Sequence, residues 1–537
     1  MDILDINILI FVLLVAFHAP QMLQRIKPAG GLKAIVFRKL VKLPYIRDQV
    51  TQEKAKAEHE YWEKYSSERS DVVSELPDQG WSPEAIRARM AQAAKHGRKC
   101  YEEHKSSGAV YNGNKDHWSL VSDVMGMHIV SNMLHFESFP HVTQMEAEII
   151  RMVLNLFHGD ADSCGIGTSG GTESILLAML AYKERGKAER AIDRPNIVCS
   201  ETAHAAFDKA GFYFGIEVRK VPLDADLLCD VTAMRAQIDS NTVCLVASSP
   251  EYPFGNYDPV PEIAALAERY GVGCHNDVCI GFINAFAEEA GFPLAYEIDF
   301  RVPGVTSIST DLHKYAFGPK GYSVCLFRDR SLRDYQFFTC MDWNGGFYAT
   351  PSIAGSRPGA VVAGTWAALV SIGRERYVSY AREIFTAQAN LRLAIKKECP
   401  EVAVATVHPS PIFAIKQLNQ SSPVGINCLA IADVLKKEYK WNLFKTMRPN
   451  GLKHVISETT MFHWRELVDG IKGSIQRIKD DPSLNHNESV ALYAMAGKMP
   501  DTCVLDAICK IHTTALLDAL KKEPPRGFSQ NKIRSSL

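Results

Sequence analysis

The sequence predicts an α/β fold in which helices cover both faces of a mainly parallel sheet. One observation is a series of short apolar runs that are typical of buried strands, at residues 196–200, 242–249, 271–277, 305–310 and 323–327. A second is the amphipathic segments between them, such as Thr172 to Arg185 and Val260 to Tyr270. Buried strands that alternate with helices are typical of a parallel sheet covered on both faces. Beyond about residue 380 the alternation is looser, which predicts a smaller C-terminal α/β domain.

Length and composition restrict the class of protein. At 537 residues the chain is long enough for two or three domains. The 60 Lys and Arg residues nearly balance 61 Asp and Glu residues, and a net charge of -1 gives no basic surface for nucleic acid. The 13 cysteines include no Cys-x-x-Cys pair, so we expect no disulfide framework, no zinc or other metal site, and a reducing compartment.

The amino terminus predicts a membrane anchor. An apolar run from Ile8 to Phe17 extends to a segment of bilayer-spanning length between Ile3 and Leu23, and basic residues follow from Arg25 onward. Basic flanks stay cytoplasmic, so we expect the rest of the chain in the cytosol and no glycan at the sequons of Asn419 and Asn487. A cleaved signal peptide would need a basic start and a small-residue cleavage site, which are absent, whereas a buried core helix stays an alternative.

Four parts follow from the patterns along the chain. Leu32 to Leu43 interleaves apolar and basic residues at helical spacing, and it either lies on an anionic membrane surface or packs on the protein. A charge-dense stretch at 51–69 predicts a solvated connecting helix. The predicted parts are the anchor with its basic juxtamembrane segment, an N-terminal helical segment, a large domain and a small domain, at residues 1–50, 51–135, 136–380 and 381–537.

A glycine-rich turn, "GIGTSGGTESIL" (165–176), opens directly into a predicted helix. Gly170 and Gly171 allow the backbone to approach a ligand closely, and free N–H groups at a helix start can hold an anion such as phosphate. The turn matches neither a dinucleotide-binding fingerprint nor a Walker loop. Taken alone, it is equally well interpreted as a plain tight turn.

Asp277 and His204 each follow a predicted strand. Ligands of parallel sheets bind at the carboxyl ends of strands, so both side chains are candidates for a site. Taken alone, Asp277 could simply cap the following helix and His204 could be a histidine at a helix start without a functional role.

Lys314 makes the functional interpretation stronger. In "VTSISTDLHKYAFGPKG" (305–321) it lies at the mouth of a strand, next to His313 and without an evident acidic partner. Partial burial weakens the charged form of an amine, which suits a Schiff base. A phosphate-binding turn, a histidine, a carboxylate and such a lysine together predict pyridoxal 5'-phosphate. In that arrangement Lys314 bonds to the cofactor, Asp277 keeps the ring nitrogen protonated and His204 stacks on the ring.

The order of these motifs resembles the group II pyridoxal-phosphate decarboxylases and their relatives. Within that set, further stretches resemble the sphingosine-1-phosphate lyase family, and the similarity runs from about residue 10 to about residue 520. These stretches are "SSGAVY" (106–111), "DSCGIGTSGGTESIL" (162–176), "FDKAGFYFG", "DFRVPGVTSIS" (299–309), "YQFF" (335–338) and "AGSRPG" (354–359).

The resemblance implies a fold-type I homodimer whose active sites are shared between subunits. It also implies retro-aldol cleavage of a phosphorylated sphingoid base between C2 and C3, giving a fatty aldehyde and phosphoethanolamine. The implied subcellular location is the endoplasmic reticulum membrane, with a single-pass anchor and the catalytic part facing the cytosol. The implied cofactor residues are Gly170, Gly171, Thr172, His204, Asp277, His313, Lys314 and, from the other subunit, Ser356. Tyr252 is implied near the reacting carbons, and the substrate-phosphate end is implied at Tyr111, Asn132, His135, Lys320 and Tyr493.

Besides Met133, which stands where the family has a first proline, four positions depart from the family pattern. Phe136 ends "NMLHF" (132–136), where the family has a second proline, and Phe254 stands where it has a histidine. Val278 and Leu312 replace an alanine and a threonine. None of these changes removes a group that binds the cofactor, but Phe136 and Phe254 alter the pocket and leave rate and chain preference open.

Two other functions stay open at this point. An amino-acid decarboxylase of the same fold would need a cation for the substrate carboxylate and no anchor. A membrane-tethered, non-catalytic relative would have no need for Lys314, Asp277 and His204 together. The visible spectrum separates them, because a lyase with bound cofactor absorbs in the near-violet and responds to a phosphorylated sphingoid base, whereas a scaffold is colourless.

Overall fold

The computed structural model describes residues 60, 73, 75–102, 105–418, 425–486 and 503–518. The predicted membrane anchor, nearly all of the predicted connecting helix, Asn419, Asn487 and Tyr493 lie outside these residues. Among the residues described, no helix combines the length and the apolar character needed to cross a bilayer. The chain divides into two compact units, Met1–His96 with Glu488–Leu537, and Gly97–Asn487. The first contains α16 (Cys503–Asp518) and the start of α4 (Pro83–Glu102).

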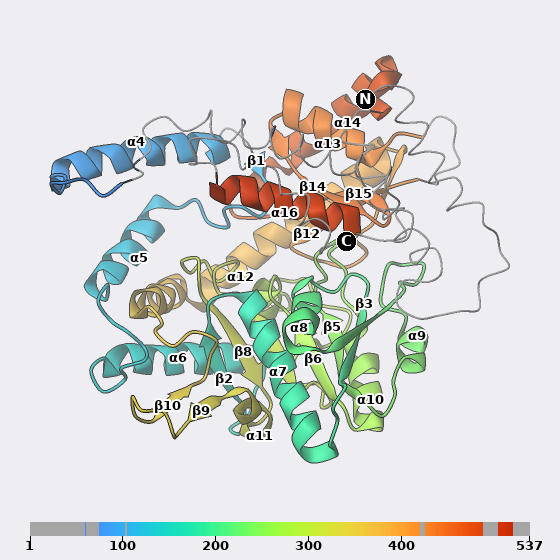
Figure 1. Ribbon diagram of the computed structural model, residues 1–537. Helices are drawn as coiled ribbons and strands as arrows, with labels where there is room; N and C mark the ends of the chain where they lie inside the picture. Colours follow the sequence, from blue (N-terminus) through green and yellow to red (C-terminus); the bar gives the residue numbers. More distant parts are fainter. Residues whose placement is uncertain are drawn as a thin grey trace, which may run out of the picture. The chain divides into compact units, whose positions relative to one another are not determined.

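The second unit is built on a seven-stranded sheet with the order β2-β8-β7-β6-β5-β3-β4 (Figure 1). Its strands are β2 (Cys164–Thr168), β3 (Asn196–Ser200), β4 (Glu217–Val221), β5 (Thr242–Ser248), β6 (Gly273–Asp277), β7 (Ser307–Thr310) and β8 (Ser323–Phe327). Only β8 runs antiparallel to its neighbours in this sheet. The predicted mainly parallel sheet is therefore confirmed.

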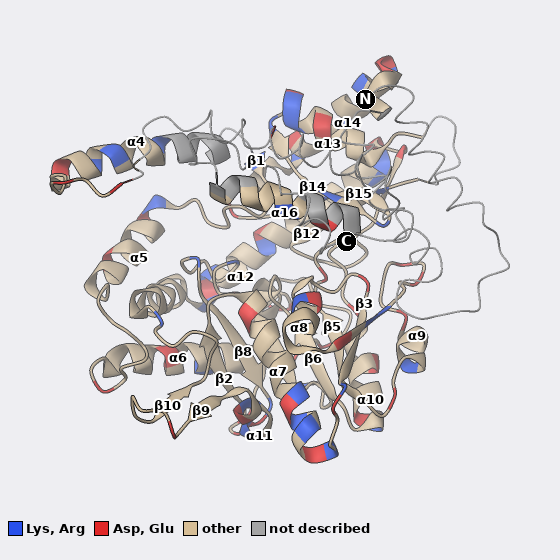
Figure 2. Ribbon diagram, viewed as in Figure 1, with Lys and Arg blue, Asp and Glu red and all other residues tan. Residues whose placement is uncertain are grey.

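The central strands form because their residues are apolar or small and bury both faces. Every residue of β3, β5, β7 and β8 is buried, as expected for strands with a covering layer on each side. Figure 2 shows these strands almost free of charged residues, whereas the C-terminal half of α7 (Gly171–Arg190) carries both signs. The apolar half of α7 packs on this sheet, where Ile175, Leu176 and Met179 join one core cluster with β3 and β5.

Helices cover the sheet, as the sequence predicts. The helices α6 (Pro140–Leu156), α8 (Ala206–Phe214) and α10 (Val260–Tyr270) contact its strands, whereas α12 (Gly359–Glu398) packs on α6 and on α5 (Lys115–Met127). The helix α10 packs on β5 and β6, and it ends at Gly271, whose φ of 62° is the left-handed conformation that glycine adopts without strain. Shorter elements are α9 (Val231–Ala236), α11 (Arg330–Arg333), β1 (Lys105–Ser106) with its partner β13 (Trp441–Asn442), and the β9–β10 hairpin (Phe338–Cys340 and Tyr348–Thr350).

The helix α12 is interrupted at Gly373, whose φ of 68° and ψ of 167° are not helical. Before this point, Trp366 donates a hydrogen bond to Glu148 on α6 at 2.6 Å. After it, Gln388 donates to the carbonyl of His408 at 3.0 Å, in the connection between the strands Val402–Val404 and Ile412–Gln417 of the second sheet. The two halves of α12 therefore serve different layers of the same unit.

A second sheet has the order β11-β12-β15-β14, and all of its pairs are antiparallel. Its strands are β11 (Val402–Val404), β12 (Ile412–Gln417), β14 (Phe444–Met447) and β15 (Asn450–Val455). The helix α13 (Cys428–Glu438) packs on this sheet, and α14 (Trp464–Asp480) packs on α13 and on α12. These elements form the smaller α/β layer expected after about residue 380, while the division at 380 itself stays a prediction.

Candidate active site

The carboxyl ends of the parallel strands gather the predicted site residues at one edge of the large sheet. His204 follows β3, Tyr252 follows β5, Asp277 ends β6, and Lys314 follows β7. Because parallel strands end at the same edge, residues far apart in the chain meet there. Burial raises the pKa values of Tyr111 and Tyr252, and both lie close enough to Lys314 for its charge to oppose this rise.

Lys314 has an acidic partner that the sequence analysis missed. Its Nζ lies 2.7 Å from Oδ2 of Asp311, three residues earlier, and the two side chains are 22% and 4% exposed. Burial lowers the pKa of Lys314, but the Asp311 carboxylate more than offsets this, so the pKa is raised above its usual value. The expectation of a weakened charged form is therefore wrong for the isolated chain, because the turn after β7 brings a carboxylate onto the amine.

Asp311 is held from several sides. Ser323, at the start of β8, donates a hydrogen bond to its Oδ1, and His313 Nε2 lies 3.7 Å from its Oδ2. Burial raises the pKa of Asp311, yet the charge of Lys314 and the hydrogen bonds from Lys314 and Ser323 bring the net pKa below its usual value. Asp311 therefore carries a negative charge that fixes the position of the Lys314 amine.

Asp277 is a buried carboxylate, 7% exposed, at the end of β6. Its Oδ1 accepts hydrogen bonds from the Cys279 N–H at 2.9 Å and from the Ser309 hydroxyl at 3.1 Å. These are contacts within the sheet edge, so the alternative of a simple helix cap does not describe it. The two donors fix the orientation of the carboxylate, which suits a partner for a protonated ring nitrogen.

The glycine-rich turn brings the start of α7 against Asp311. A Cβ on Gly171 would lie 2.7 Å from Asp311 Oδ1 and 2.6 Å from the Cys279 sulfur, so only glycine fits there. Within the same motif, Glu173 accepts from the Ser169 N–H at 2.6 Å and from the Ile353 N–H at 3.0 Å. Gly170, Gly171 and Thr172 thus form the first turn of a 20-residue helix, where N–H groups are available to an anion.

The two predicted ring and phosphate histidines lie in different settings. His204 is exposed, and its Nδ1 accepts a hydrogen bond from the Ala206 N–H at 3.1 Å. His313 is half-buried, and its Nδ1 lies 3.0 Å from the Tyr322 carbonyl oxygen. Burial lowers the pKa of His313, although Asp311 opposes this shift. His313 is therefore held as a neutral ring beside the Lys314 amine.

Tyr111 and Lys320 both lie near Lys314. Tyr111 is 6% exposed, and burial raises the pKa of its phenol. The Lys320 Nζ lies 4.8 Å from the centroid of the Tyr111 ring and donates to the His313 carbonyl at 3.1 Å. Burial lowers the pKa of Lys320. This pair is suited to an anionic end of a ligand.

A second buried lysine, Lys453 on β15, was not identified from the sequence. It is 5% exposed, its Nζ donates to the Tyr252 carbonyl at 3.0 Å, and it lies 2.8 Å from the centroid of the Tyr252 ring. Burial lowers the pKa of Lys453 and raises that of the neighbouring Glu251. A lysine inside the apolar stretch "LKHVI" was the sequence signal that could have indicated it.

Asn132, His135 and Ser356 form a separate group. Asn132 donates to the Ser356 hydroxyl at 3.0 Å and accepts from the Arg357 N–H at 3.2 Å. His135 is exposed. Among the described residues, no hydrogen bond or ion pair joins this group to Lys314.

The four departures from the family pattern are distributed between core and surface. Phe254, Val278 and Leu312 are each at most 1% exposed, whereas Phe136 is 61% exposed. Phe254 belongs to a small core cluster with Ala405 and Ala414. A histidine at 254 would therefore point into apolar packing, while Phe136 is an apolar surface residue.

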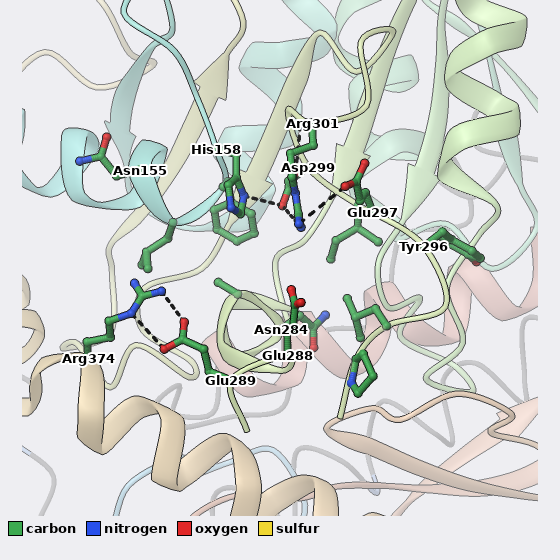
Figure 3. Close-up of a pocket in the computed structure, with 16 residues that line it drawn as sticks. Asn155, His158, Asn284, Glu288, Glu289, Tyr296, Glu297, Asp299, Arg301 and Arg374 are labelled. Atoms are coloured by element: carbon green, nitrogen blue, oxygen red, sulfur yellow. Dashed lines mark hydrogen bonds and ion pairs between the residues drawn. The ribbon is translucent and has the colours of Figure 1, made fainter. Parts of the chain in front are cut away.

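A cavity of about 350 Å³ lies elsewhere in the unit, between the end of α6 and the region around Arg374 (Figure 3). Its charged side chains pair with one another. Asp299 binds His158 at 3.1 Å and Arg301 at 2.8 Å, and Arg374 pairs with Glu289. None of the predicted cofactor or substrate residues lines this cavity.

Comparison with known proteins identifies the family. The model of the pyridoxal-dependent decarboxylase conserved domain matches residues 75–415. Mouse sphingosine-1-phosphate lyase 1 is 37% identical over 492 residues, which are 90% of this chain and 84% of the mouse protein. The Saccharomyces cerevisiae sphingosine-1-phosphate lyase is 34% identical over 500 residues, 91% of this chain and 83% of the yeast protein. A solved sphingosine-1-phosphate lyase from Burkholderia pseudomallei has a TM-score of 0.73 and 33% identity, covering 78% of this chain and 96% of that one.

The fold and the residues at its sheet edge define a pyridoxal-phosphate-dependent lyase of the decarboxylase type. Within this class, the chain belongs to the sphingosine-1-phosphate lyase family.

The residues present fit pyridoxal 5'-phosphate. The Lys314 amine, the buried Asp277 carboxylate and the start of α7 lie at the same edge of the sheet. At Gly171 a side chain would collide with Asp311 and Cys279, so the backbone at the helix start stays uncovered. Ser248 pairs in register with Asp277 across β5 and β6, and its buried hydroxyl has no hydrogen-bond partner among the described residues. Because buried polar groups are normally paired, this hydroxyl indicates a polar ligand at the edge.

Proposed function

We propose that this chain cleaves the C2–C3 bond of a phosphorylated sphingoid base and releases a fatty aldehyde and phosphoethanolamine. The observation that carries the proposal is the Lys314–Asp311 pair at the carboxyl edge of the sheet, flanked by Tyr111 and Tyr252. Relatives named sphingosine-1-phosphate lyase support the substrate, since they align over about nine tenths of the chain.

The reaction needs a base at the C3 hydroxyl and a place for the electron pair left at C2. When bound, pyridoxal 5'-phosphate supplies the electron sink. In the chain alone Asp311 keeps the Lys314 amine protonated, so the proposal requires this amine to enter the reaction neutral. In that form Lys314 Nζ takes the proton of the C3 hydroxyl, so that the C3 oxygen becomes the aldehyde carbonyl. Burial raises the pKa of Tyr252, so its phenol is protonated and can donate to C2. Lys314 interacts electrostatically with Tyr252, so the proton that Lys314 took from the C3 hydroxyl can pass to Tyr252 and replace the proton given to C2.

Other residues bind and orient. Asp277 holds the proton on the ring nitrogen of the cofactor, while Gly170, Gly171, Thr172 and His313 hold its phosphate, and His204 stacks on its ring. Lys320 and Tyr111 bind the substrate phosphate, because a cation and a phenol favour a phosphate monoester. Their contact at 4.8 Å supports this role. Asn132, His135 and Tyr493 complete that end of the pocket.

The site is proposed to be shared between two copies of the chain in a homodimer. Ser356 would then reach the cofactor phosphate of the other copy, with Asn132 and His135 beside it. The separation of the Asn132–Ser356 group from Lys314 supports this arrangement, since residues that complete a second site need no contact with their own. Mixing Lys314→Ala and Ser356→Ala chains tests it, because mixed dimers regain one intact site.

The amino terminus is proposed to anchor the enzyme in the endoplasmic reticulum membrane, with the catalytic part in the cytosol. The apolar run at 8–17 and the basic residues after it support this topology. Protease protection of sealed microsomes tests the orientation, because a cytosolic catalytic part is digested without detergent.

The substrate is tested by incubating the purified protein with dihydrosphingosine phosphate and following aldehyde and phosphoethanolamine by mass spectrometry. Lys314→Ala is the control. Carbon dioxide release from free amino acids, without aldehyde from the sphingoid base, would instead indicate an amino-acid decarboxylase.

A further inference from the structure

We propose that His275 is a positioning residue for the reaction, which acts through Ser309 to keep Asp277 ionised and correctly oriented toward the cofactor ring. This proposal rests on the proposed function with its bound cofactor. It extends that function to residues that touch neither the substrate nor the cofactor. The alternative is that His275 only fills the core of the sheet.

Strand geometry brings these side chains to one face. His275 and Asp277 are two residues apart on β6, so they point to the same side of the sheet. Their register partners on β7 are Ser307 and Ser309. All four side chains are at most 7% exposed, and His275, Ser307 and Ser309 are fully buried.

The four side chains form a continuous chain of hydrogen bonds. Ser309 Oγ lies 3.1 Å from Asp277 Oδ1 and 3.1 Å from His275 Nε2. His275 Nδ1 lies 2.7 Å from Ser307 Oγ, which lies 2.6 Å from the hydroxyl of Tyr182 on α7. This series of hydrogen bonds therefore runs from Tyr182 on α7 to the Asp277 carboxylate at the sheet edge.

The charge of Asp277 fixes the direction of every proton in this chain. A carboxylate only accepts, so Ser309 donates to Asp277 and must itself accept from the His275 Nε2–H. A neutral imidazole has one N–H, so Nδ1 accepts from the Ser307 hydroxyl, which in turn accepts from Tyr182. Thr306, whose hydroxyl lies 2.7 Å from the Tyr182 oxygen, donates its proton to the Cys274 carbonyl at 3.0 Å, so the series begins at Tyr182.

The imidazole is neutral in this position. Burial lowers the pKa of His275 to about 4, with Asp277 as the one opposing charge. The ring also packs edge-on against Phe207, with centroids 5.9 Å apart. A neutral ring with Nε2 protonated makes a fixed dipole that points its donor toward Asp277.

Protonation of Asp277 would work against this order. The carboxyl would no longer attract the Ser309 proton, and each donor behind it would have to turn. The series of hydrogen bonds thus favours the ionised form of the Asp277 carboxylate in a buried position, where an unpaired charge costs free energy. An ionised Asp277 in turn keeps a proton on the ring nitrogen of the cofactor.

The test uses the purified full chain loaded with pyridoxal 5'-phosphate labelled with ¹⁵N in the ring. The ¹⁵N chemical shift separates a protonated from an unprotonated ring nitrogen, and titration of the unloaded chain gives the cofactor dissociation constant. Neither readout needs a sphingoid substrate, so a negative lyase assay and a failure of this proposal are distinguishable.

Two variants interrupt the series of hydrogen bonds between Tyr182 and Asp277 at different points. In Ser309→Ala the carboxylate loses a direct donor, and we expect the dissociation constant to rise about 10- to 100-fold. In His275→Phe the donor behind Ser309 is lost, so the ¹⁵N shift should move toward the unprotonated value and kcat should fall more than KM rises. His275→Gln should restore part of the signal, because its amide can donate to Ser309.

His454→Phe is the matched control. His454 is also a fully buried histidine, on β15, but its Nδ1 has no hydrogen-bond partner among the described residues and no described hydrogen bond joins it to Asp277. The ¹⁵N shift and the cofactor affinity should stay as in the parent chain. The proposal is overturned if Ser309→Ala and His275→Phe keep the protonated ¹⁵N signal, or if His454→Phe alters it as strongly as they do.

Discussion

Substituting Gly171 by alanine tests whether the cofactor cradle depends on close contact between α7 and Asp311. The added Cβ would lie 2.7 Å from Asp311 Oδ1 and 2.6 Å from the Cys279 sulfur, and ordinary contacts begin at 3.4 Å. The carboxylate must therefore move by about 0.7 Å. Asp311 is bound to Lys314 at 2.7 Å and to Ser323, so it cannot move without loosening both contacts.

Overpacking of this kind costs about 1–3 kcal/mol. Alanine in place of glycine in a helix returns at most about 1 kcal/mol. Because Gly171 is the first residue of α7, where little is returned, the net change in the free energy of unfolding should be a loss of up to about 3 kcal/mol. The cofactor should also bind about 10-fold more weakly, since the helix start and the Lys314 amine are both displaced.

The assay is a thermal melt with and without cofactor, together with a titration that follows absorbance of the bound cofactor. Gly126→Ala is the matched control, because Gly126 lies in helix α5 with no atom within 4 Å of the added Cβ. Gly126→Ala should raise the melting temperature, whereas Gly171→Ala should lower it. Equal melting temperatures and equal cofactor affinity for Gly171→Ala and the parent chain would refute the reasoning.

Four further predictions follow from the same structure. Lys314→Ala should abolish turnover and leave the chain folded, because the side chain is 22% exposed and Asp311 keeps the hydrogen bond from Ser323; residual turnover above a trace in the aldehyde assay would show that another group does the chemistry. Asp277→Asn should retain bound cofactor but lose most activity, since an amide does not hold the ring proton; near-normal kcat would contradict that role. Burial lowers the pKa of His454 to about 3, so the unfolded chain binds a proton below about pH 6.5 that the folded chain does not. Stability should therefore fall as the pH decreases from 6.5 toward 3, by at most about 5 kcal/mol, and His454→Phe should flatten the melting temperature between pH 6.5 and 4. Expression in a eukaryotic cell should leave Asn419 and Asn487 without glycans, and a gel shift reversed by a deglycosylating enzyme would place the catalytic part in the lumen.

The sequence was most informative where strands are buried on both faces. The runs at 196–200 and 323–327 match β3 and β8, and Val260 to Tyr270 matches α10. The direction of β8 was not predicted from these patterns. Its connection from β7 spans 311–322 without a helix, so the chain turns back and the strand pairs antiparallel.

Contacts made by turns were harder to predict than strands. Asp311 was visible in the sequence, three residues before Lys314, but only the fold of the turn after β7 brings the two groups to 2.7 Å. Lys453 and His275 lay in apolar stretches that indicated only buried strands. Their partners come from other strands and loops, so no local pattern indicates them. Conversely, Lys314, Asp277 and Gly171 were identified because each stands at a strand end or a helix start, where the local pattern defines the position.

The break in α12 has a mechanical consequence. The first half of the helix is fastened to α6 through Trp366, and the second half to the strands of the smaller sheet through Gln388. A rod of 40 residues would carry any tilt of one layer undiminished into the other. With Gly373 outside the helical conformation, the helix is divided, and a tilt of one half is not passed directly to the other. Lys453 stays joined to the edge of the large sheet by its hydrogen bond to the Tyr252 carbonyl, so the two sheets are linked at the site itself and not through a continuous helix.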